Sequence, residues 1–353
     1  MTAYQNRLRA FTFSDPAWIP FRVIITEQAW LAYPQEELKK LVTDHPLTFG
    51  DIDTDDIDVA GMPTIPWRDS SRDYRDSWGA LWRTVTDGMT GTVIEHPLAA
   101  WDSWNTVSLP DPDRENGWGE VDWNSLAENF RKAKRLGTEP PAMELRHGHT
   151  FLTLVYLRGF ENLVYDMFDE EPRLRELIGA IESFNLRCLH HLMEAGPDIV
   201  GFPEDLGSQN NSLISPELFR KYIKPSYRRL MAVPKLAGKI VHMHCDGWIL
   251  NLVDDLIDCG VEVLNIQDMI HGIDELKRCV DGRIALELDV DRQNVTVFGS
   301  QADIRGLIRE EVEKLSSPSG GLALLFEIRP PVDLENVRVL CSAMEEFSGI
   351  KSI

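Results

Sequence analysis

From about residue 150 onward, short apolar runs rich in β-branched residues alternate with longer stretches in which apolar positions recur at helical spacing. This alternation is typical of β/α units that build a parallel sheet. The predicted strands are 151–157, 198–203, 239–244, 261–266, 283–288 and 321–328. The predicted helices are 172–194, 216–237, 249–258, 273–280 and 302–315.

Glycine marks the junctions between these elements. Gly196, Gly238, Gly260 and Gly282 each stand where a predicted helix must stop before the next strand. Glycine is favoured there because the residue that ends a helix often takes a left-handed conformation. The recurrence of glycine at the predicted helix ends supports a series of β/α units.

The first 150 residues are less regular. They contain one predicted strand at 19–25, one helix at 34–42, and a Trp-, Asp- and Pro-rich region at about 50–137. Its seven tryptophans favour a folded cap or β-subdomain over a disordered linker. We therefore predict an α/β protein in which residues 1–353 form one barrel domain with an N-terminal elaboration.

The composition narrows the classes of partner. A net charge of −21 disfavours nucleic acid and anionic membrane surfaces. The sequence has neither an apolar signal core nor a stretch long enough to span a membrane, so we expect a cytoplasmic protein. The five cysteines include no Cys-x-x-Cys pair, which argues against a disulfide framework or a thiolate zinc knuckle.

The ends of the predicted strands are unusually polar, and in a β/α barrel such ends converge on one mouth. Strand alternation places His242, His244 and Asp246 on one face. Two imidazoles and a carboxylate, completed by Glu327 or Glu204, suit a divalent metal, with zinc, iron and nickel as candidates. The alternative is a site without metal, in which His242 is a core histidine and His244 is an acid-base group.

Other candidates follow from position alone. Asp205 lies in an acidic loop after a strand, and we expect a catalytic role for it together with His244 and Asp246. Cys245 should point to the opposite face and be buried. We do not expect His147-x-His149 or His190-His191 to be ligands. Candidate substrate-binding residues are Arg22, Arg158, Asn265, Gln267, Asp289 and Gln293, where the arginines would anchor an anionic group and the others would bind a ligand or seal strand ends.

The order of several motifs resembles the uroporphyrinogen decarboxylase superfamily, in particular its branch of corrinoid-dependent methyltransferases. The motifs are YRDSWG (74–79), GTVIEHPL (91–98), RGFEN (158–162), EDLGSQ (204–209), ISPELF (214–219), HCDG (244–247) and LENV (334–337). The resemblance implies a distorted (β/α)8 TIM-type barrel.

The sequence differs from the known members of this family at two sets of catalytic residues, and these differences limit which reaction the resemblance implies. The zinc methyltransferases of the family carry His-x-Cys-Gly on the central strand and a further cysteine on the last one. Here His244 takes the place of the histidine, Asp246 that of the first cysteine, and 326–328 the region of the second. A metal held by His244, Asp246 and Glu327 would be harder than a thiolate site, which weakens the expectation of thiol activation. The decarboxylase branch's Arg-Gln-Ala-Gly-Arg segment near the N-terminus and its C-terminal Gly-His-Gly are also absent.

Three functional hypotheses remain open. The leading one is methyl or other one-carbon transfer linked to a corrinoid partner protein, with a small-molecule substrate and zinc as the preferred ion if a metal binds. The second is a lyase or decarboxylase that uses His244 and Asp205 as acid and base. The third is an accessory subunit without catalysis. A homodimer is also expected from the aromatic residues of the first 130 positions.

Overall fold

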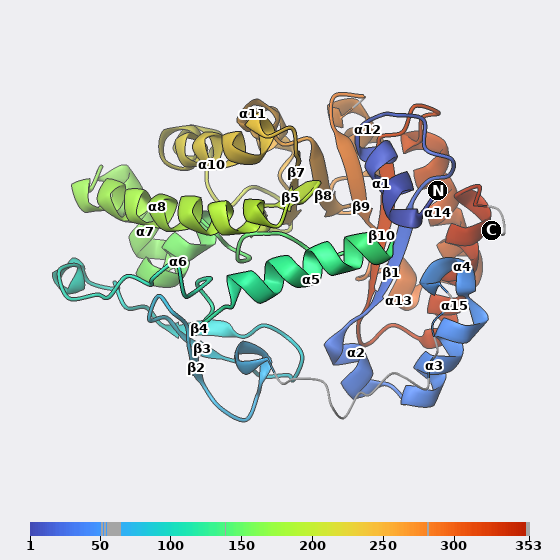
Figure 1. The fold of residues 1–353 in the computed structure, drawn as a ribbon, viewed down its shortest axis with the longest axis horizontal. Helices are drawn as coiled ribbons and strands as arrows, with labels where there is room; N and C mark the ends of the chain where they lie inside the picture. Colours follow the sequence, from blue (N-terminus) through green and yellow to red (C-terminus); the bar gives the residue numbers. More distant parts are fainter. Residues whose placement is uncertain (51, 53, 55–64, 138, 281, 351–353) are drawn as a thin grey trace. The chain divides into compact units, whose positions relative to one another are not determined.

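The computed structural model describes residues 1–50, 52, 54, 65–137, 139–280 and 282–350 (Figure 1). The chain divides into two compact units. Unit 1 consists of Met1–Arg72, Thr84–Gly91 and Gln267–Ile353, and unit 2 consists of Asp73–Arg83 and Thr92–Ile266.

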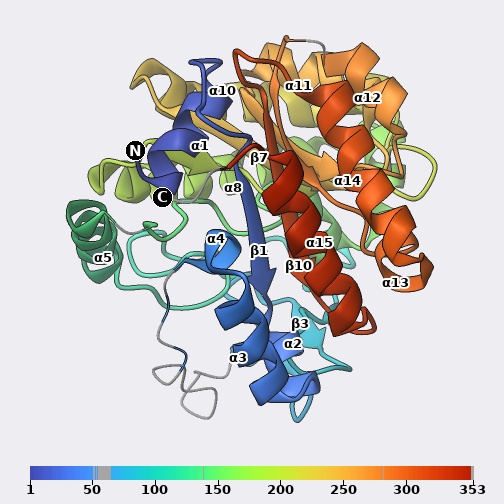
Figure 2. The ribbon, with the colours of Figure 1, turned by 90° about the vertical axis from the view of Figure 1, so that its right-hand side faces the viewer.

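Unit 1 contains three parallel strands in the spatial order β1, β10, β9. They are β1 (Phe21–Ile25), β10 (Leu322–Ile328) and β9 (Ala285–Asp289). Its helices are α1 (Ala3–Phe11), α2 (Glu27–Ala32), α3 (Gln35–Asp44), α4 (Pro46–Phe49), η2 (Pro66–Arg68), α12 (Ile273–Val280), α13 (Val295–Phe298), α14 (Gln301–Leu315) and α15 (Leu334–Phe347). Figure 2 shows α14 and α15 side by side.

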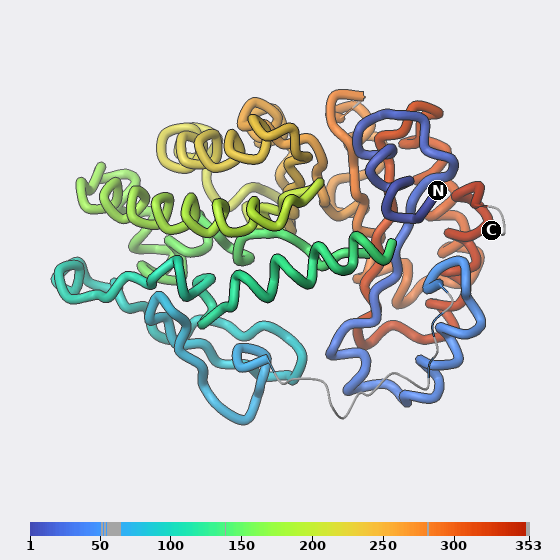
Figure 3. Tube along the Cα trace, viewed as in Figure 1, coloured from blue at the N-terminus to red at the C-terminus, as the bar shows by residue number. Residues whose placement is uncertain are grey.

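Unit 2 contains parallel strands in the order β5, β7, β8, and a short strand β6 also pairs with β7. These are β5 (Ile199–Gly201), β6 (Glu204–Asp205), β7 (Ile240–Asp246) and β8 (Val263–Gln267). Its helices are η3 (Trp101–Ser103), α5 (Trp123–Leu136), α6 (Phe151–Arg158), α7 (Phe160–Phe168), α8 (Pro172–Glu194), α9 (Pro216–Leu218), η4 (Phe219–Ile223), α10 (Lys224–Leu236), η5 (Leu250–Leu252) and α11 (Val253–Cys259). In Figure 3, α8 and α10 run side by side.

The Trp-rich region contributes a three-stranded antiparallel sheet to unit 2, made of β2 (Tyr74–Arg75), β3 (Leu81–Arg83) and β4 (Thr92–Glu95). The turn between β2 and β3 is organised by the buried carboxylate of Asp76. This carboxylate accepts hydrogen bonds from the Trp82 indole at 3.0 Å and from Arg146 at 2.8 Å. The Arg146 guanidinium lies 4.2 Å from the ring centroid of Trp118. A charge buried in this way is tolerated because it is both paired and stacked.

The prediction that glycines with a left-handed conformation follow the helices is confirmed. Gly196, Gly238, Gly260 and Gly282 have φ angles of +74°, +67°, +111° and +72°. Side chains with a Cβ rarely adopt this left-handed region, so each position favours glycine. That residues 1–353 form one domain stays a prediction.

One predicted strand is wrong, because residues 151–157 form helix α6. The parallel segment that lies beside β5 comes earlier in the chain: Glu144 bridges Gly201, and the Leu145 N–H donates to the Gly201 carbonyl at 3.1 Å. A short apolar run fits a buried helix as well as a strand, and α6 buries Phe151, Leu154 and Leu157.

The other predicted strands and helices are present, with shifts of a few residues at their ends. Parallel strands alternate with helices in both units, which is the predicted α/β class. No helix within the described ranges has the length and apolarity that crossing a membrane requires.

Candidate functional site

Strand β7 carries the first group of candidate side chains. Burial alternates along it, so that His242, His244 and Asp246 are partly exposed while Met243 and Cys245 are buried. The predicted sidedness of this strand is therefore correct. Burial raises the pKa of the Cys245 thiol well above its usual value, which makes it a poor nucleophile.

Asp205 is positioned by the short strand β6, where it pairs with Asp246 of β7. The Asp246 backbone N–H donates to Asp205 Oδ1 at 3.0 Å, which fixes the carboxylate beside the end of β7. The turns that follow are joined as well, since the Trp248 N–H donates to the Ser208 carbonyl at 2.7 Å.

His147 reaches the same place from the loop before α6. The Gly148 N–H donates to the Pro203 carbonyl at 2.9 Å, which ties this loop to the segment leading into β6. As a result, His147 Nε2 lies 3.4 Å from Asp205 Oδ2. The sequence did not favour His147 as a ligand, and the structure places it beside Asp205.

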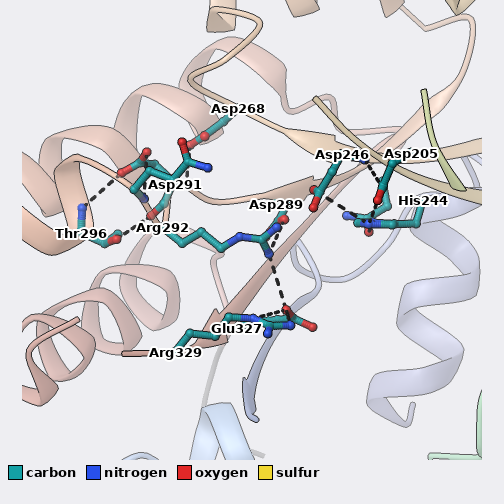
Figure 4. Close-up of polar contacts among 12 residues, drawn as sticks. Asp205, His244, Asp246, Asp268, Asp289, Asp291, Arg292, Thr296, Glu327 and Arg329 are labelled. Atoms are coloured by element: carbon teal, nitrogen blue, oxygen red, sulfur yellow. Dashed lines mark hydrogen bonds and ion pairs between the residues drawn. The ribbon is translucent and has the colours of Figure 1, made fainter. Parts of the chain in front are cut away.

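His147, Asp205 and His244 form what we call the His–Asp–His cluster. His244 Nε2 lies 3.9 Å from Asp205 Oδ1 and 3.8 Å from Asp246 Oδ1 (Figure 4). Each member of the cluster offers one ligand atom, and these atoms all lie within 4.8 Å of one another. Side-chain exposure is 39% for His147, 30% for Asp205 and 24% for His244, so the cluster is open to small molecules.

The electrostatics of the cluster favour positive charge next to Asp205. Burial alone would raise the pKa of Asp205, but the hydrogen bond and charge of His147, with the charge of His244, lower it to about 2. Burial would likewise lower the pKa of His147, yet its hydrogen bond with Asp205 and the nearby carboxylates raise it. The carboxylate and imidazole thus stabilise each other's charged forms.

Asn265 orients the His244 ring. His244 Nδ1 lies 2.7 Å from Asn265 Oδ1, its neighbour in the β7–β8 register. Because an amide oxygen only accepts hydrogen bonds, Nδ1 donates to it, and Nε2 is the ring nitrogen that faces Asp205. Asn265, predicted as a ligand-binding or strand-sealing residue, therefore contacts the site through His244.

A buried layer supports the cluster. The Glu204 carboxylate accepts the backbone N–H groups of Thr150, Phe151 and Leu152 at 2.9 to 3.1 Å, and so caps the start of α6. Tyr227 also donates to it, at 2.9 Å. Glu204 is fully buried and engaged in this way, which leaves it a structural role.

Two further side chains of this region, His149 and Tyr156, were not predicted as site residues. Burial lowers the pKa of His149 to about 3, so this buried imidazole is neutral. Tyr156 lies over Gly148, where an added Cβ would be 3.3 Å from the phenol oxygen, and its ring packs edge-on against Trp82. Burial raises the pKa of Tyr156, so its hydroxyl stays protonated. Neither residue has a sequence signal beyond its neighbourhood.

Unit 1 contains a second set of charged side chains, at the ends of β9 and β10. Arg292 lies 2.9 Å from Asp289 and 3.5 Å from Glu327, and Arg329 lies 2.6 Å from Glu327 (Figure 4). Arg22 on β1 lies 3.1 Å from Glu287. The guanidinium groups of this set are thus ion-paired with carboxylates of β9 and β10. Arg292 was not predicted.

The remaining predicted residues are spread over both units. Arg158 ends α6, not a barrel strand, and its buried guanidinium pairs with Asp166 at 2.8 Å, so the structure gives it a partner within the protein. The Gln267 carbonyl accepts from His271 Nδ1 at 2.6 Å, and the Gln293 N–H donates to Asp291 at 3.4 Å. Of the predicted metal set, His242, His244 and Asp246 lie on β7 in unit 2, whereas Glu327 belongs to unit 1.

Comparisons with known proteins give this arrangement a context. The chain is 24% identical over 159 residues to a methylcobamide:CoM methyltransferase from Methanosarcina barkeri, and this match spans 44% of each chain. It is 25% identical over 189 residues to a uroporphyrinogen decarboxylase from Thermus thermophilus, covering 52% of this chain and 51% of that protein. The chain therefore aligns with only about half the length of these curated relatives.

The fold extends further than these sequence matches. A solved methyltransferase structure from Methanosarcina mazei superposes with a TM-score of 0.64, covering 98% of this chain and 99% of that one at 17% sequence identity. Together with the alternating parallel strands and helices, this confirms the predicted distorted TIM-type barrel. The family model for uroporphyrinogen decarboxylase matches residues 87–347, which is most of the chain. The chain belongs to the uroporphyrinogen decarboxylase family.

Proposed function

We propose that this protein transfers a methyl or other one-carbon group, and that the reaction takes place at the His–Asp–His cluster. The observation that carries the proposal is the partly exposed carboxylate of Asp205, held between two imidazoles on the carboxyl-end side of β6 and β7. Two relatives described as methyltransferases, one by sequence and one by fold, support the reaction class.

The methyl donor in this proposal is a methylated corrinoid carried by a partner protein, as the name of the Methanosarcina barkeri relative suggests. A corrinoid supplies a methyl group that can leave without its bonding electrons. The acceptor then loses a proton and forms the new bond to the methyl carbon, while the carrier retains the electron pair. The identities of the methyl donor and of the acceptor are part of this proposal.

The residues of the chain would manage the proton of the acceptor. His244 presents the lone pair of Nε2, since its Nδ1–H is bound to Asn265, and can accept that proton as a general base. Asp205 stabilises the imidazolium that forms, because its carboxylate lies 3.9 Å from the same nitrogen. His147 shares the other oxygen of Asp205 and keeps the carboxylate oriented.

The residues around His244 do not fit the thiolate zinc site that the family resemblance implies. Asp246 stands at the position of the first cysteine, and Cys245 is buried on the opposite face of β7. The proposed activation of the acceptor by His244 therefore uses no zinc-bound thiolate.

The test is methyl transfer from methylcobalamin to a panel of thiol, amine and hydroxyl acceptors, followed by the loss of methylcobalamin absorption and by mass spectrometry of the product. We expect His244→Ala and Asp205→Asn to lower the rate by about 10²- to 10⁴-fold, the usual contribution of acid-base catalysis. His190→Ala, an exposed position on α8, should leave the rate unchanged. The absence of methyl exchange with every acceptor, in folded wild-type protein, would contradict the proposal.

A second candidate function is decarboxylation. The decarboxylase relative from Thermus thermophilus favours it, and the raised pKa of His147 suits a group that protonates the carbon left after CO₂ departs. Release of labelled CO₂ from candidate carboxylic acids, without methyl transfer, would select this reaction over the first.

A further inference from the structure

The His–Asp–His cluster has the donor atoms and spacing of a metal centre. On a tetrahedral ion with ligand bonds of about 2.0 to 2.2 Å, neighbouring ligand atoms lie about 3.3 to 3.6 Å apart. His147 Nε2 lies 3.4 Å from Asp205 Oδ2, and His244 Nε2 lies 3.9 Å from the other carboxylate oxygen, Oδ1. One ligand atom from each of the three residues lies within 4.8 Å of the other two. Small side-chain movements would therefore bring the three residues onto one ion.

The ligand atoms are also directed correctly. The His244 Nδ1–H is bound to Asn265, which leaves Nε2 as the ligating nitrogen. A hydrogen bond of this kind to the second ring nitrogen is a regular feature of metal-binding histidines. His147 presents its Nε2 to the same carboxylate from the loop before α6.

The three ligands come from separate segments that the backbone holds together. His147 is fixed by the bond from Gly148 to Pro203, and Asp205 by the bond from the Asp246 N–H. The cluster keeps 24% to 39% side-chain exposure, whereas the nearby His149 and Glu204 side chains are fully buried. An ion could thus enter from solvent and still have positions open for a substrate.

We propose that His147, Asp205 and His244 bind one borderline divalent cation of the first transition series, such as Zn²⁺, Fe²⁺ or Co²⁺. Two imidazoles and one carboxylate suit such ions, whereas Mg²⁺ and Ca²⁺ prefer sites made of oxygen ligands. This ligand set differs from His242, His244, Asp246 and Glu327, which the strand pattern suggested. The proposal does not depend on methyl transfer, because it concerns binding alone. With the ion bound, the lone pair of His244 Nε2 is used as a ligand, so the general-base role of His244 belongs to the metal-free protein.

Isothermal titration of the chelator-treated full chain with Zn²⁺ tests the proposal. We expect one ion per chain. His147→Ala and Asp205→Asn should each weaken binding by at least about 100-fold, more than the 10- to 100-fold typical of a residue that only orients a ligand. His242→Ala and His190→Ala should bind as the wild type does. Circular dichroism of each variant establishes that it is folded.

Titration with Co²⁺ gives a second readout that does not involve activity. The visible absorption of bound Co²⁺ reports the number and type of its ligands, so His147→Gln should change the spectrum while retaining the size of the side chain. Wild-type protein that binds neither ion, or a folded His147 variant with wild-type affinity and spectrum, would overturn the proposal. Loss of binding in His242→Ala with full binding in His147→Ala would also overturn it. Metal binding without methyl transfer would leave this proposal standing and contradict only the proposed function.

Discussion

The five cysteines differ sharply in their surroundings. Cys188, Cys245, Cys259 and Cys341 are buried and Cys279 is partly exposed. Burial raises the pKa of the Cys188, Cys259 and Cys341 thiols to about 12, and that of Cys245 well above its usual value. At neutral pH these four thiols are protonated and shielded from reagents.

We therefore predict that a thiol reagent such as DTNB modifies one cysteine per native chain, at Cys279. All five should react in denaturant, and Cys279→Ser should remove the native reaction. Rapid modification of Cys245 in the native protein would contradict its placement on the buried face of β7.

Asn265 provides a second prediction at the level of single residues. Asn265→Ala removes the acceptor of the His244 Nδ1–H, so the ring can adopt the other tautomer and rotate. We expect a loss of about 10- to 100-fold in Zn²⁺ affinity, the usual effect of removing a group that orients a ligand.

Nitrogen chemical shifts of His244 in the metal-free variant would report the tautomer directly. Asn251→Ala is a suitable control, because this exposed amide donates to Ser212 and not to a histidine of the cluster. A wild-type tautomer together with unchanged affinity in Asn265→Ala would show that the hydrogen bond has no such role.

At the level of elements, the turns after β6 and β7 touch through two glycines. A Cβ added to Gly247 would overlap the backbone of Gly207, and Gly247 has a φ of +82°. The contact holds Asp205 and Asp246 side by side, because these residues immediately precede the two turns.

We predict that Gly247→Ala lowers the free energy of unfolding by more than the roughly 1 to 2 kcal/mol that a left-handed conformation costs an alanine. It should also weaken Zn²⁺ binding, since separating the turns moves Asp205 away from His244. Urea unfolding measures the first effect and titration the second.

Gly179→Ala in α8 is the matched control. An added Cβ meets no atom within 4 Å there, and the helical conformation favours alanine by about 0.5 to 1 kcal/mol. Equal effects of the two substitutions would contradict the account of the turns.

The composition of helix α6 is the reason why residues 151–157 were predicted as a strand. Its sequence, FLTLVYLR, is almost uniformly apolar and gives no helical period because several of its faces are buried. The group that caps it, Glu204, lies more than 50 residues later in the chain. Local sequence therefore could not reveal where this helix begins.

At the level of the whole molecule, stability should depend on a buried carboxyl group of unit 1. Glu311 of α14 is fully buried beside Asp268. Burial, followed by the interactions with Asp268 and the charge of Asp291, raises the pKa of Glu311 well above its usual value. The folded protein therefore keeps a proton that the unfolded chain releases above about pH 4.3.

Because the folded state binds this extra proton, its contribution to the free energy of unfolding falls as pH rises from about 4.3 to the folded pKa. We predict that Glu311→Gln, which cannot ionise, makes stability fall less between pH 5 and pH 8 than it does in the wild type. Urea unfolding across this range measures the difference. Glu310→Gln, at the exposed neighbouring position, should keep the wild-type pH dependence, and parallel curves for wild type and Glu311→Gln would refute the prediction.

The sequence by itself determined the series of β/α units, the glycine positions that end helices, and the face of β7 that carries His244. These features depend on local periodicity and on backbone preferences, which a single segment expresses without its neighbours. Asp205 was also predicted, because it follows directly from a strand end.

Only the tertiary structure decided which side chains meet. His147 joins Asp205 because hydrogen bonds tie its loop to a segment more than 50 residues away, and no spacing in the sequence encodes that contact. Arg292, which follows β9, likewise lies 3.5 Å from Glu327 of β10, and Arg22 of β1 pairs with Glu287 of β9. A site assembled from separate segments is set by the packing of the chain, whereas each segment's own structure is set largely by its residues.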